Sequence, residues 1–252
     1  MIVRAHKNGY ILIEQDHHAQ TSGDMIKKWK EIHFPKSEHK ASVIYAIDKH
    51  DIGWKPFDQE PFWNDLAEKP YSFIDFPNSA KTMLYASGID QVEAVDSYAG
   101  LLCSIHYTRF LKGDASPISR KFVKQEKQRQ QRIIQMAGNF DSELFAKYYS
   151  LLQLCDNLSL FICLNEPGTN QHPFFKEGIP LPANLESFTG EKINLTWKDK
   201  TTVALSDFPF VSEVSFSYPY KWLVTESIVD KGLIPAYQQA PFRETTISFV
   251  PH

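Results

Sequence analysis

Histidine and aspartate side chains recur at four places in the first two thirds of the chain, each within a largely apolar stretch. They are His18, the pair His50-Asp51, His106 and Asp156. A buried histidine or carboxylate without a partner is penalised by several kcal/mol, so several of them together favour a shared ligand. Imidazole nitrogens and carboxylate oxygens suit divalent Mn, Fe, Co, Ni or Zn, or Mg with more water. Because no thiolate accompanies them, the pattern predicts an open metal site of the catalytic type.

Helical periodicity places these residues on buried faces of predicted helices. Val43, Ile47 and His50 follow one another at i, i+4 and i+7, so the His50 ring points toward the core. Asp156 is the one carboxylate in the middle of an apolar stripe, which makes an unpaired state costly. The predicted helices cover residues 16–32, 37–51, 79–88, 90–113, 116–138 and 141–164.

Both ends of the chain have the pattern of β-strands, and Asn8-Gly9 is a hairpin turn signal. The strand-like runs are residues 2–5, 10–14, 191–206, 211–224 and 244–251. Residues 53–79 read as one long ordered loop. We therefore predict a mainly α protein, a helical bundle with a small antiparallel β appendage. The expected parts are a hairpin at 1–14 that packs with the C-terminal strands, a helical metal-binding domain at 15–170 and a β-rich appendage at 171–252.

Composition limits the classes of partner. Hydrophobic residues make up 42% of the chain and charged residues 23%, the balance of a soluble globular protein. The net charge of -3 provides no global positive field for nucleic acid or an anionic membrane. The basic run at residues 119–132 resembles a nucleic-acid patch, but its interleaved glutamines and few aromatic residues favour a solvated helix face. We expect no nucleic-acid or membrane partner, and the oligomeric state stays open, an oligomer included.

Compartment and cysteine use give a consistent expectation. No run approaches the roughly 18 apolar residues of a membrane-spanning helix, and no signal-peptide pattern is found at the start. The three cysteines lie inside apolar segments without metal-type spacing, which favours buried free thiols in a reducing compartment. We therefore expect a cytoplasmic protein.

The order of the candidate ligands resembles that of the HD-domain metal-dependent phosphohydrolases. That family has a histidine on one helix, a His-Asp doublet on the next and an aspartate on a later helix. Here the corresponding stretches are "DHHAQTSGDM", "KHDIGW" and "LQLCDNLSLF". The resemblance covers roughly residues 14–165 and implies an HD-domain-like helical bundle. The chain as a whole is also similar to an uncharacterised bacterial family that opens "IVR…G…LI.Q.DHA", for which no activity is implied.

The resemblance implies a role for each candidate residue. His18 or its neighbour His17, His50, Asp51 and Asp156 would be metal ligands, and His106 matches the position of a second-metal histidine in some members. One or two ions are implied, with Asp51 as a bridging and catalytic residue. The phosphodiesterase subgroup with "HDIG" continues with lysine and carries a Gly-Tyr-Pro signature. This chain has Trp54 and lacks that signature, so a cyclic dinucleotide is not implied.

Each residue also has a structural interpretation. His50-Asp51 can simply end a helix, where the helix dipole favours histidine and aspartate turns the chain. His18 can be a capping residue, His106 a satisfied core histidine, and Asp156 a hydrogen-bond partner between helices. The choice between these interpretations and metal binding depends on whether the side chains converge.

The sequence leads to one predicted function and one alternative. The prediction is a phosphohydrolase, a phosphomonoesterase or phosphodiesterase, that uses metal-activated water on a small phosphorylated or nucleotide-like substrate. Arg109, at i+3 from His106, is the nearest cation for the phosphate charge and the second candidate catalytic residue beside Asp51. The weaker candidate cations are Lys55, Arg120, Lys121 and Lys124. The alternative is a catalytically silent module that binds a ligand or a partner.

Overall fold

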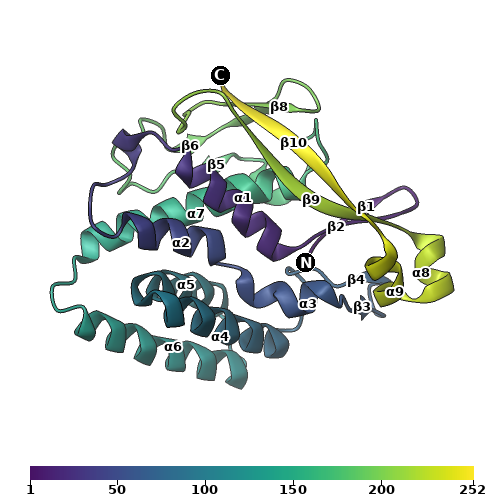
Figure 1. Ribbon diagram of the computed structural model, residues 1–252, viewed down its shortest axis with the longest axis horizontal. Helices are drawn as coiled ribbons and strands as arrows, with labels where there is room; N and C mark the ends of the chain where they lie inside the picture. Colours follow the sequence, from purple (N-terminus) through teal and green to yellow (C-terminus); the bar gives the residue numbers. More distant parts are fainter.

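Helices and one large sheet make up most of the protein, which a computed structural model describes over residues 1–252 (Figure 1). About 50% of the residues are helical and 19% are in strands. The long helices are α1 (Gln15–Lys27), α2 (Lys40–Lys49), α4 (Asn78–Val95), α5 (Ser97–Leu111), α6 (Pro117–Met136) and α7 (Ser142–Leu164). The short helices are α3 (Lys55–Gln59), α8 (Thr225–Lys231), α9 (Leu233–Gln239) and the 3-10 turns η1 (Glu31–His33), η2 (Ile52–Trp54) and η3 (Pro173–Phe175).

The boundary between α4 and α5 differs from the sequence prediction, which ended a helix at Gly88. The α4 helix continues to Val95, and α5 begins after Asp96, whose carboxylate accepts a hydrogen bond from the Ala99 amide at 2.9 Å. Gly88 has a packing role instead. A Cβ added there would lie 2.9 Å from the Cα of Gly53, so these two glycines let η2 approach the backbone of α4 closely.

Six strands form one curled sheet in the order β1-β2-β9-β10-β8-β7. All neighbouring pairs are antiparallel except β8 and β10, which are parallel. The hairpin reaches the C-terminal strands because β2 pairs with β9, with Leu12 opposite Lys221. The strands of this sheet are β1 (Ile2–His6), β2 (Gly9–Ile13), β7 (Leu195–Trp197), β8 (Thr202–Leu205), β9 (Val214–Val224) and β10 (Phe242–Pro251).

The predicted fold class, a mainly α bundle with a small antiparallel appendage, is wrong. The sheet is mixed and curls into a half-barrel, and its long strands β9 and β10 run through its middle. The error has a physical cause: β10 is inserted between β9 and β8, and no local pattern in the sequence reports which strand a given strand pairs with. Residues 53–79, predicted as a loop, contain η2, α3 and a short ladder of β3 (Trp63–Asn64) with β4 (Lys69–Pro70).

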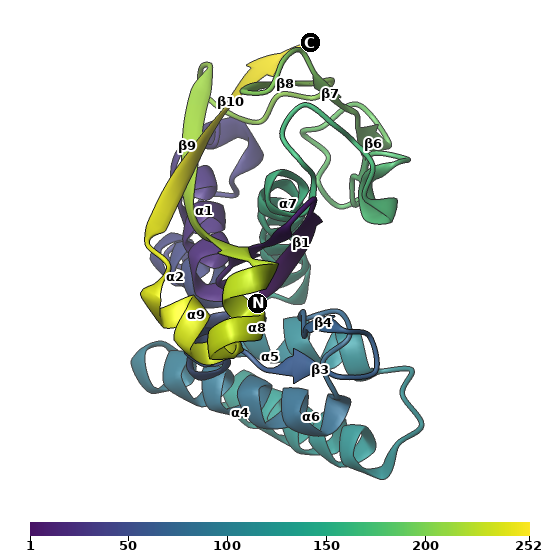
Figure 2. The ribbon, with the colours of Figure 1, turned by 90° about the vertical axis from the view of Figure 1, so that its right-hand side faces the viewer.

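The sheet and the helices share one hydrophobic core of 55 buried residues. The concave side of the sheet covers α1 and α7, and α4, α5 and α6 lie beyond them (Figures 1 and 2). One polar contact also joins these layers, because the Tyr218 hydroxyl on β9 donates to the Ile162 carbonyl of α7 at 3.0 Å. A further short ladder, β5 (Ile179–Pro180) with β6 (Lys192–Ile193), follows α7. The core thus places α1, α2, α5 and α7 around a common centre.

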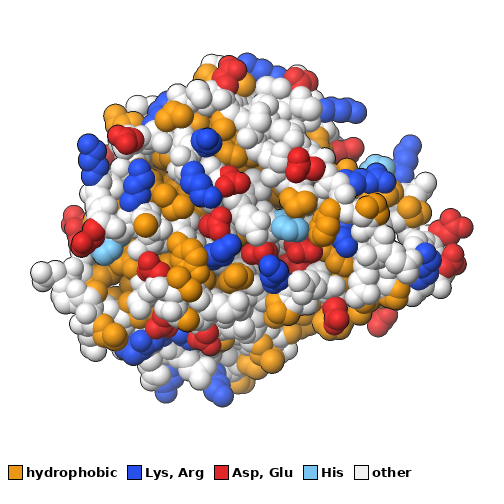
Figure 3. Space-filling model, in the orientation of Figure 1, with side chains coloured by type: hydrophobic (Ala, Val, Ile, Leu, Met, Phe, Trp, Pro, Cys, Tyr) orange, Lys and Arg blue, Asp and Glu red, His pale blue; other side chains and the backbone are white.

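The surface carries charges of both signs. On the face shown in Figure 3, basic and acidic side chains are interspersed, in keeping with a net charge of -3. None of the helices combines the length and the apolar character that crossing a membrane demands.

Candidate metal centre

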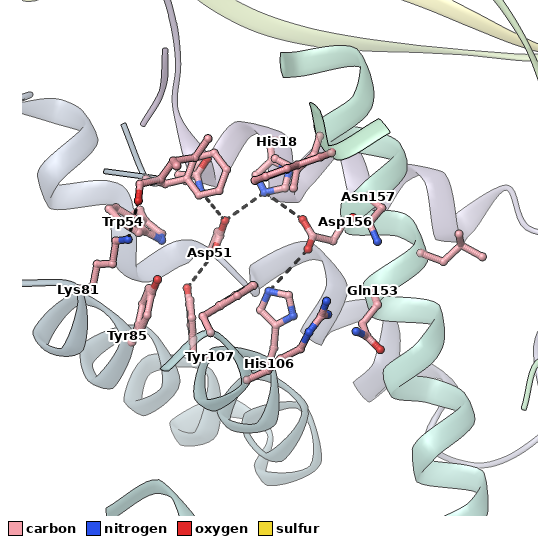
Figure 4. A pocket seen from close by; sticks show the side chains of 18 of the residues that line it. His18, Asp51, Trp54, Lys81, Tyr85, His106, Tyr107, Gln153, Asp156 and Asn157 are labelled. Atoms are coloured by element: carbon pink, nitrogen blue, oxygen red, sulfur yellow. Dashed lines mark hydrogen bonds and ion pairs between the residues drawn. The ribbon is translucent and has the colours of Figure 1, made fainter. Parts of the chain in front are cut away.

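Four helices bring the candidate ligands together in the core, and Figure 4 shows four of them, His18, Asp51, His106 and Asp156. His18 lies in the first turn of α1, His50 directly follows α2, His106 is on α5 and Asp156 is on α7. Asp51 leaves the helical conformation, with φ -112° and ψ 15°, and so turns the chain from α2 into η2. All five residues are buried, with exposed fractions between 0% and 8%. The fold therefore brings together residues that are far apart in the sequence.

The distances between these side chains fit one metal ion. His18 Nε2 lies 3.1 Å from Asp51 Oδ2 and 3.7 Å from Asp156 Oδ1. His50 Nε2 lies 3.8 Å and 3.6 Å from the same two oxygens. Metal bonds of about 2.0–2.2 Å place neighbouring ligand atoms roughly 3.0–3.6 Å apart in octahedral or tetrahedral geometry. These buried histidine and aspartate groups can therefore hold a metal ion.

Hydrogen bonds outside the cluster determine which nitrogen of each ring carries the proton. His50 Nδ1 donates to the Ile47 carbonyl at 2.7 Å, because a carbonyl oxygen only accepts. The Ser159 hydroxyl donates to the His18 carbonyl at 2.7 Å, so its oxygen accepts from His18 Nδ1 at 3.1 Å. In both neutral rings the Nε2 lone pair then faces the carboxylates. This arrangement, with an outer hydrogen bond on Nδ1 and a free Nε2, is that of a metal-binding histidine.

The electrostatics of the cluster call for a cation. His50 Nε2 is buried and has no hydrogen-bond partner. Burial opposes charge on this ring, but the Asp51 and Asp156 carboxylates outweigh burial and raise the His50 pKa to about 9. Burial likewise opposes charge on both carboxyl groups, yet the surrounding histidines hold their pKa values below the usual range. Two carboxylates thus need positive charge, which either a proton on His50 or a metal ion provides.

His106 occupies a different position in the cluster. Its Nε2 lies 3.8 Å from Asp156 Oδ2, the carboxylate oxygen that faces away from His18 and His50. Its Nδ1 is buried without a partner. Burial lowers the His106 pKa to about 4, against the attraction of Asp156. The ring is therefore neutral at neutral pH and has a nitrogen available to a ligand.

Three residues that the sequence analysis did not select hold the candidate ligands. Gln15 Nε2 donates to Asp51 Oδ2 at 2.9 Å, and the Tyr107 hydroxyl donates to Asp51 Oδ1 at 3.0 Å. Ser159 fixes the His18 ring, as described above. Only Ser159 had a sequence signal, since it lies at i+3 from Asp156 and thus shares its helix face.

The structure also separates His17 from His18. The His17 ring is packed against Phe242, and its Nε2 lies 3.9 Å from a Glu14 carboxylate oxygen. It does not join the cluster. Of these two adjacent histidines, His18 is the one whose ring nitrogen lies within 4 Å of both Asp51 and Asp156.

The cluster lies at the base of a pocket of about 590 Å³. Arg109 and Lys81 are the cationic residues that line it; burial lowers the Lys81 pKa, and its ammonium donates to the Ile74 carbonyl at 3.2 Å. Trp54 also lines the pocket and is 1% exposed. The weaker candidate cations Lys55, Arg120, Lys121 and Lys124 do not line the pocket. Other lining residues include Gln153, Asn157, Phe73, Phe110 and Phe174.

These features define a protein of helices and one curled mixed sheet in which a buried histidine and aspartate cluster, able to hold a metal ion, lies at the base of a pocket. The chain belongs to the family described as "Protein of unknown function (DUF3891)", whose model matches residues 1–225. Neither a comparison with curated proteins nor one with solved structures found a match. The matched range includes every residue of the cluster and of the pocket, but it ends before α9 and β10.

Proposed function

We propose that this protein is a metal-dependent phosphohydrolase that acts on a small phosphorylated or nucleotide-like molecule. The proposal is carried by His50 Nε2, a buried nitrogen that lies close to two carboxylates and has no hydrogen-bond partner. A divalent cation is a group that this nitrogen and both carboxylates can bind together. The resemblance of the His-Asp pattern to HD-domain phosphohydrolases supports the same assignment.

The donor set narrows the choice of ion. Two imidazole nitrogens, from His18 and His50, and two carboxylate oxygens, from Asp51 and Asp156, suit Mn, Fe, Co, Ni or Zn, and suit Mg less well. When bound, such an ion polarises a phosphoryl oxygen and lowers the pKa of a water molecule. The rest of the chemistry depends on the side chains around it.

The pocket residues have distinct roles in this proposal. Neutral His106 can accept a hydrogen bond at a ring nitrogen and so orient a water or a substrate hydroxyl. The cations of Arg109 and Lys81 can bind phosphate oxygens at the pocket wall. The Phe110 and Phe174 rings, each about half exposed, offer an apolar surface for the organic part of the substrate.

The test begins with metal analysis of the purified protein. Hydrolysis of p-nitrophenyl phosphate and of bis(p-nitrophenyl) phosphate is then measured with Mn, Ni or Mg. We expect bound metal and metal-dependent release of nitrophenol from at least one of the two substrates. Absence of bound metal, together with unchanged hydrolysis in a double variant carrying His50→Ala and Asp51→Ala, would show that the proposal is wrong.

Adjacent histidines provide a matched pair of variants. His18→Ala should lower the metal content and reduce hydrolysis on the order of 100-fold, because it removes a nitrogen ligand. His17→Ala should leave both within about twofold, because His17 lies outside the cluster. Bound metal without turnover of either substrate would instead favour the silent ligand-binding module.

A further inference from the structure

We propose that Tyr107 holds Asp51 as a one-oxygen ligand and that the cluster consequently takes one metal ion per chain, not a bridged pair. This inference rests on the proposed metal site and specifies its nuclearity. It assigns a positioning role to a tyrosine that lies next to His106 on α5.

The two oxygens of the Asp51 carboxylate have different neighbours. Both histidines that approach it do so at Oδ2, with His18 Nε2 at 3.1 Å and His50 Nε2 at 3.8 Å. The opposite oxygen, Oδ1, accepts the hydroxyl of Tyr107 at 3.0 Å. A carboxylate that bridges two ions places one oxygen on each of them. In this protein the Tyr107 hydroxyl takes the direction at Oδ1 that a second ion would need, whereas Oδ2 accepts from Gln15 and still has a lone pair toward the two histidines.

The cluster has too few ligand atoms for two ions. The potential ligands fall into two groups, one with His18 and Asp51 and one with His106 and Asp156, and both groups include His50. His50 has only one free nitrogen, since Nδ1 donates to the Ile47 carbonyl. A second ion would be left with His106 Nε2 and Asp156 Oδ2, 3.8 Å apart. Catalytic sites usually provide three protein ligands, so this remainder is incomplete.

Tyr107 is held rigidly in the core. Its side chain is 1% exposed and stacks on Tyr85, with ring centroids 4.1 Å apart and an interplanar angle of 20°. The ring therefore cannot move its hydroxyl away from Asp51 without disturbing the core. Gln15 adds a second constraint, because its amide donates to Oδ2 at 2.9 Å. Asp51 is thus held from both sides in the orientation that offers one oxygen to an ion.

The experiment counts ions in the whole chain by equilibrium dialysis against excess Mn²⁺ and records the electron paramagnetic resonance spectrum. The unmodified protein should bind one ion and show the spectrum of isolated Mn²⁺. Tyr107→Phe removes only the hydroxyl that occupies Oδ1, so it should bind a second ion and show a spin-coupled spectrum. Adding His106→Ala to that variant should return the count to one.

Tyr85→Phe is the matched control. It removes a hydroxyl from the same aromatic stack and the same pocket, but that hydroxyl does not bond to Asp51. Its count should stay at one. If Tyr107→Phe fails to fold, His106→Ala in the otherwise unmodified protein still tests the inference, because a mononuclear site without His106 keeps its ion.

The possible failures are distinct. A protein that binds two spin-coupled ions without any substitution would overturn this inference and leave the proposed function standing. The same holds for a Tyr107→Phe variant whose ion count and spectrum do not change. A protein that binds no ion at all would overturn the proposed function itself, and this inference with it.

Discussion

Two buried polar clusters share the α5 helix, and they differ in how completely their groups are paired. Ser104 and His106 lie two residues apart on this helix, and both are buried. Ser104 belongs to a cluster toward α6, in which its hydroxyl donates to Glu126 at 2.8 Å. His106 belongs to the cluster with Asp156, described above.

The cluster around Glu126 is complete. Glu126 is 3% exposed, and its Oε1 also accepts a hydrogen bond from Arg129 Nε at 3.2 Å. The guanidinium of Arg129 pairs in addition with Asp90 and Glu93 on α4. Each charged group therefore has a partner of opposite charge within the chain. We infer that this cluster joins α4, α5 and α6 and has a structural role.

The cluster around Asp156 is incomplete by the same measure. Three of its atoms are buried without a hydrogen-bond partner: His50 Nε2, His106 Nδ1 and the side-chain amide oxygen of Gln15. Unpaired buried polar atoms cost stability, and they persist where a ligand completes them. Burial of charge is thus common to both clusters, and the unpaired ligand-type atoms beside a pocket distinguish the cluster around Asp156. Three substitutions and one pH series test this difference between the clusters.

Asp156→Asn should weaken metal binding by about 4 kcal/mol, on the order of 1000-fold in Kd, if four ligands share the binding free energy equally. In the presence of a chelator the variant should unfold at a slightly lower temperature, because the histidines that depress the Asp156 pKa stabilise its charged form and an amide does not carry that charge. Isothermal titration with Mn²⁺ and thermal unfolding measure these two effects. A large loss of stability with unchanged affinity would remove the distinction between the clusters.

Glu126→Ala should lower the free energy of unfolding by about 3 kcal/mol, because it leaves Ser104 and part of Arg129 without their buried partner. Metal affinity should not change. Chemical denaturation and titration measure the two quantities, with the exposed Glu213→Ala as a control expected within about 0.5 kcal/mol of the unmodified protein. Loss of metal binding in Glu126→Ala would contradict the separation of the two clusters, because it would show that Glu126 also supports the metal site.

Metal affinity should rise with pH, about tenfold per unit between pH 6 and pH 8. In the metal-free protein the His50 pKa is raised to about 9, so below that pH the ion must displace a proton from Nε2. The stability of the metal-free protein changes with pH in the opposite direction. The raised pKa stabilises the metal-free fold below about pH 6.5, the value of an unperturbed histidine, and this contribution is lost as the pH rises toward 9. Titrations and thermal unfolding across this range test both slopes, and a flat affinity profile would contradict the assignment of His50.

Ser159→Ala should weaken metal binding about tenfold, because the hydroxyl oxygen no longer accepts from His18 Nδ1 and the ring loses its orientation. Ser150→Ala provides the control on the same helix, since Ser150 is also buried but bonds to Asn184 at 2.9 Å, away from the cluster. Equal effects of the two substitutions would mean that Ser159 acts through the packing of α7 alone.

The helical part of the fold was open to prediction because its signals are local. Val43, Ile47 and His50 share a face that periodicity alone reveals. The sequence analysis placed the end of α4 at Gly88 because glycine often ends a helix. In the structure α4 continues past Gly88, whose missing side chain makes room for Gly53. The parallel pairing of β8 with β10 brings together strands about 45 residues apart, and neither strand has a pattern that selects the other.

The candidate site shows the same limit. His18, His50, Asp51, His106 and Asp156 could be selected because each places a polar group on an apolar helix face. Gln15 and Tyr107 could not, since an amide and a phenol are ordinary residues at a helix start and in an aromatic core. Their roles come from hydrogen bonds to Asp51, which is 36 residues from one and 56 from the other.

The position of β10 has a consequence for how the protein folds. This strand lies between β9 and β8, although it follows both in the chain, and the match to the family model ends at residue 225, before it. Until residues 242–251 are in place, β7 and β8 have no hydrogen-bonded connection to β9, and two strand edges stay open. The sheet can therefore close only after synthesis has reached β10, and its assembly depends on long-range contacts, which form slowly. A chain interrupted after α9 would expose the inner edges of β8 and β9 and would be prone to aggregate.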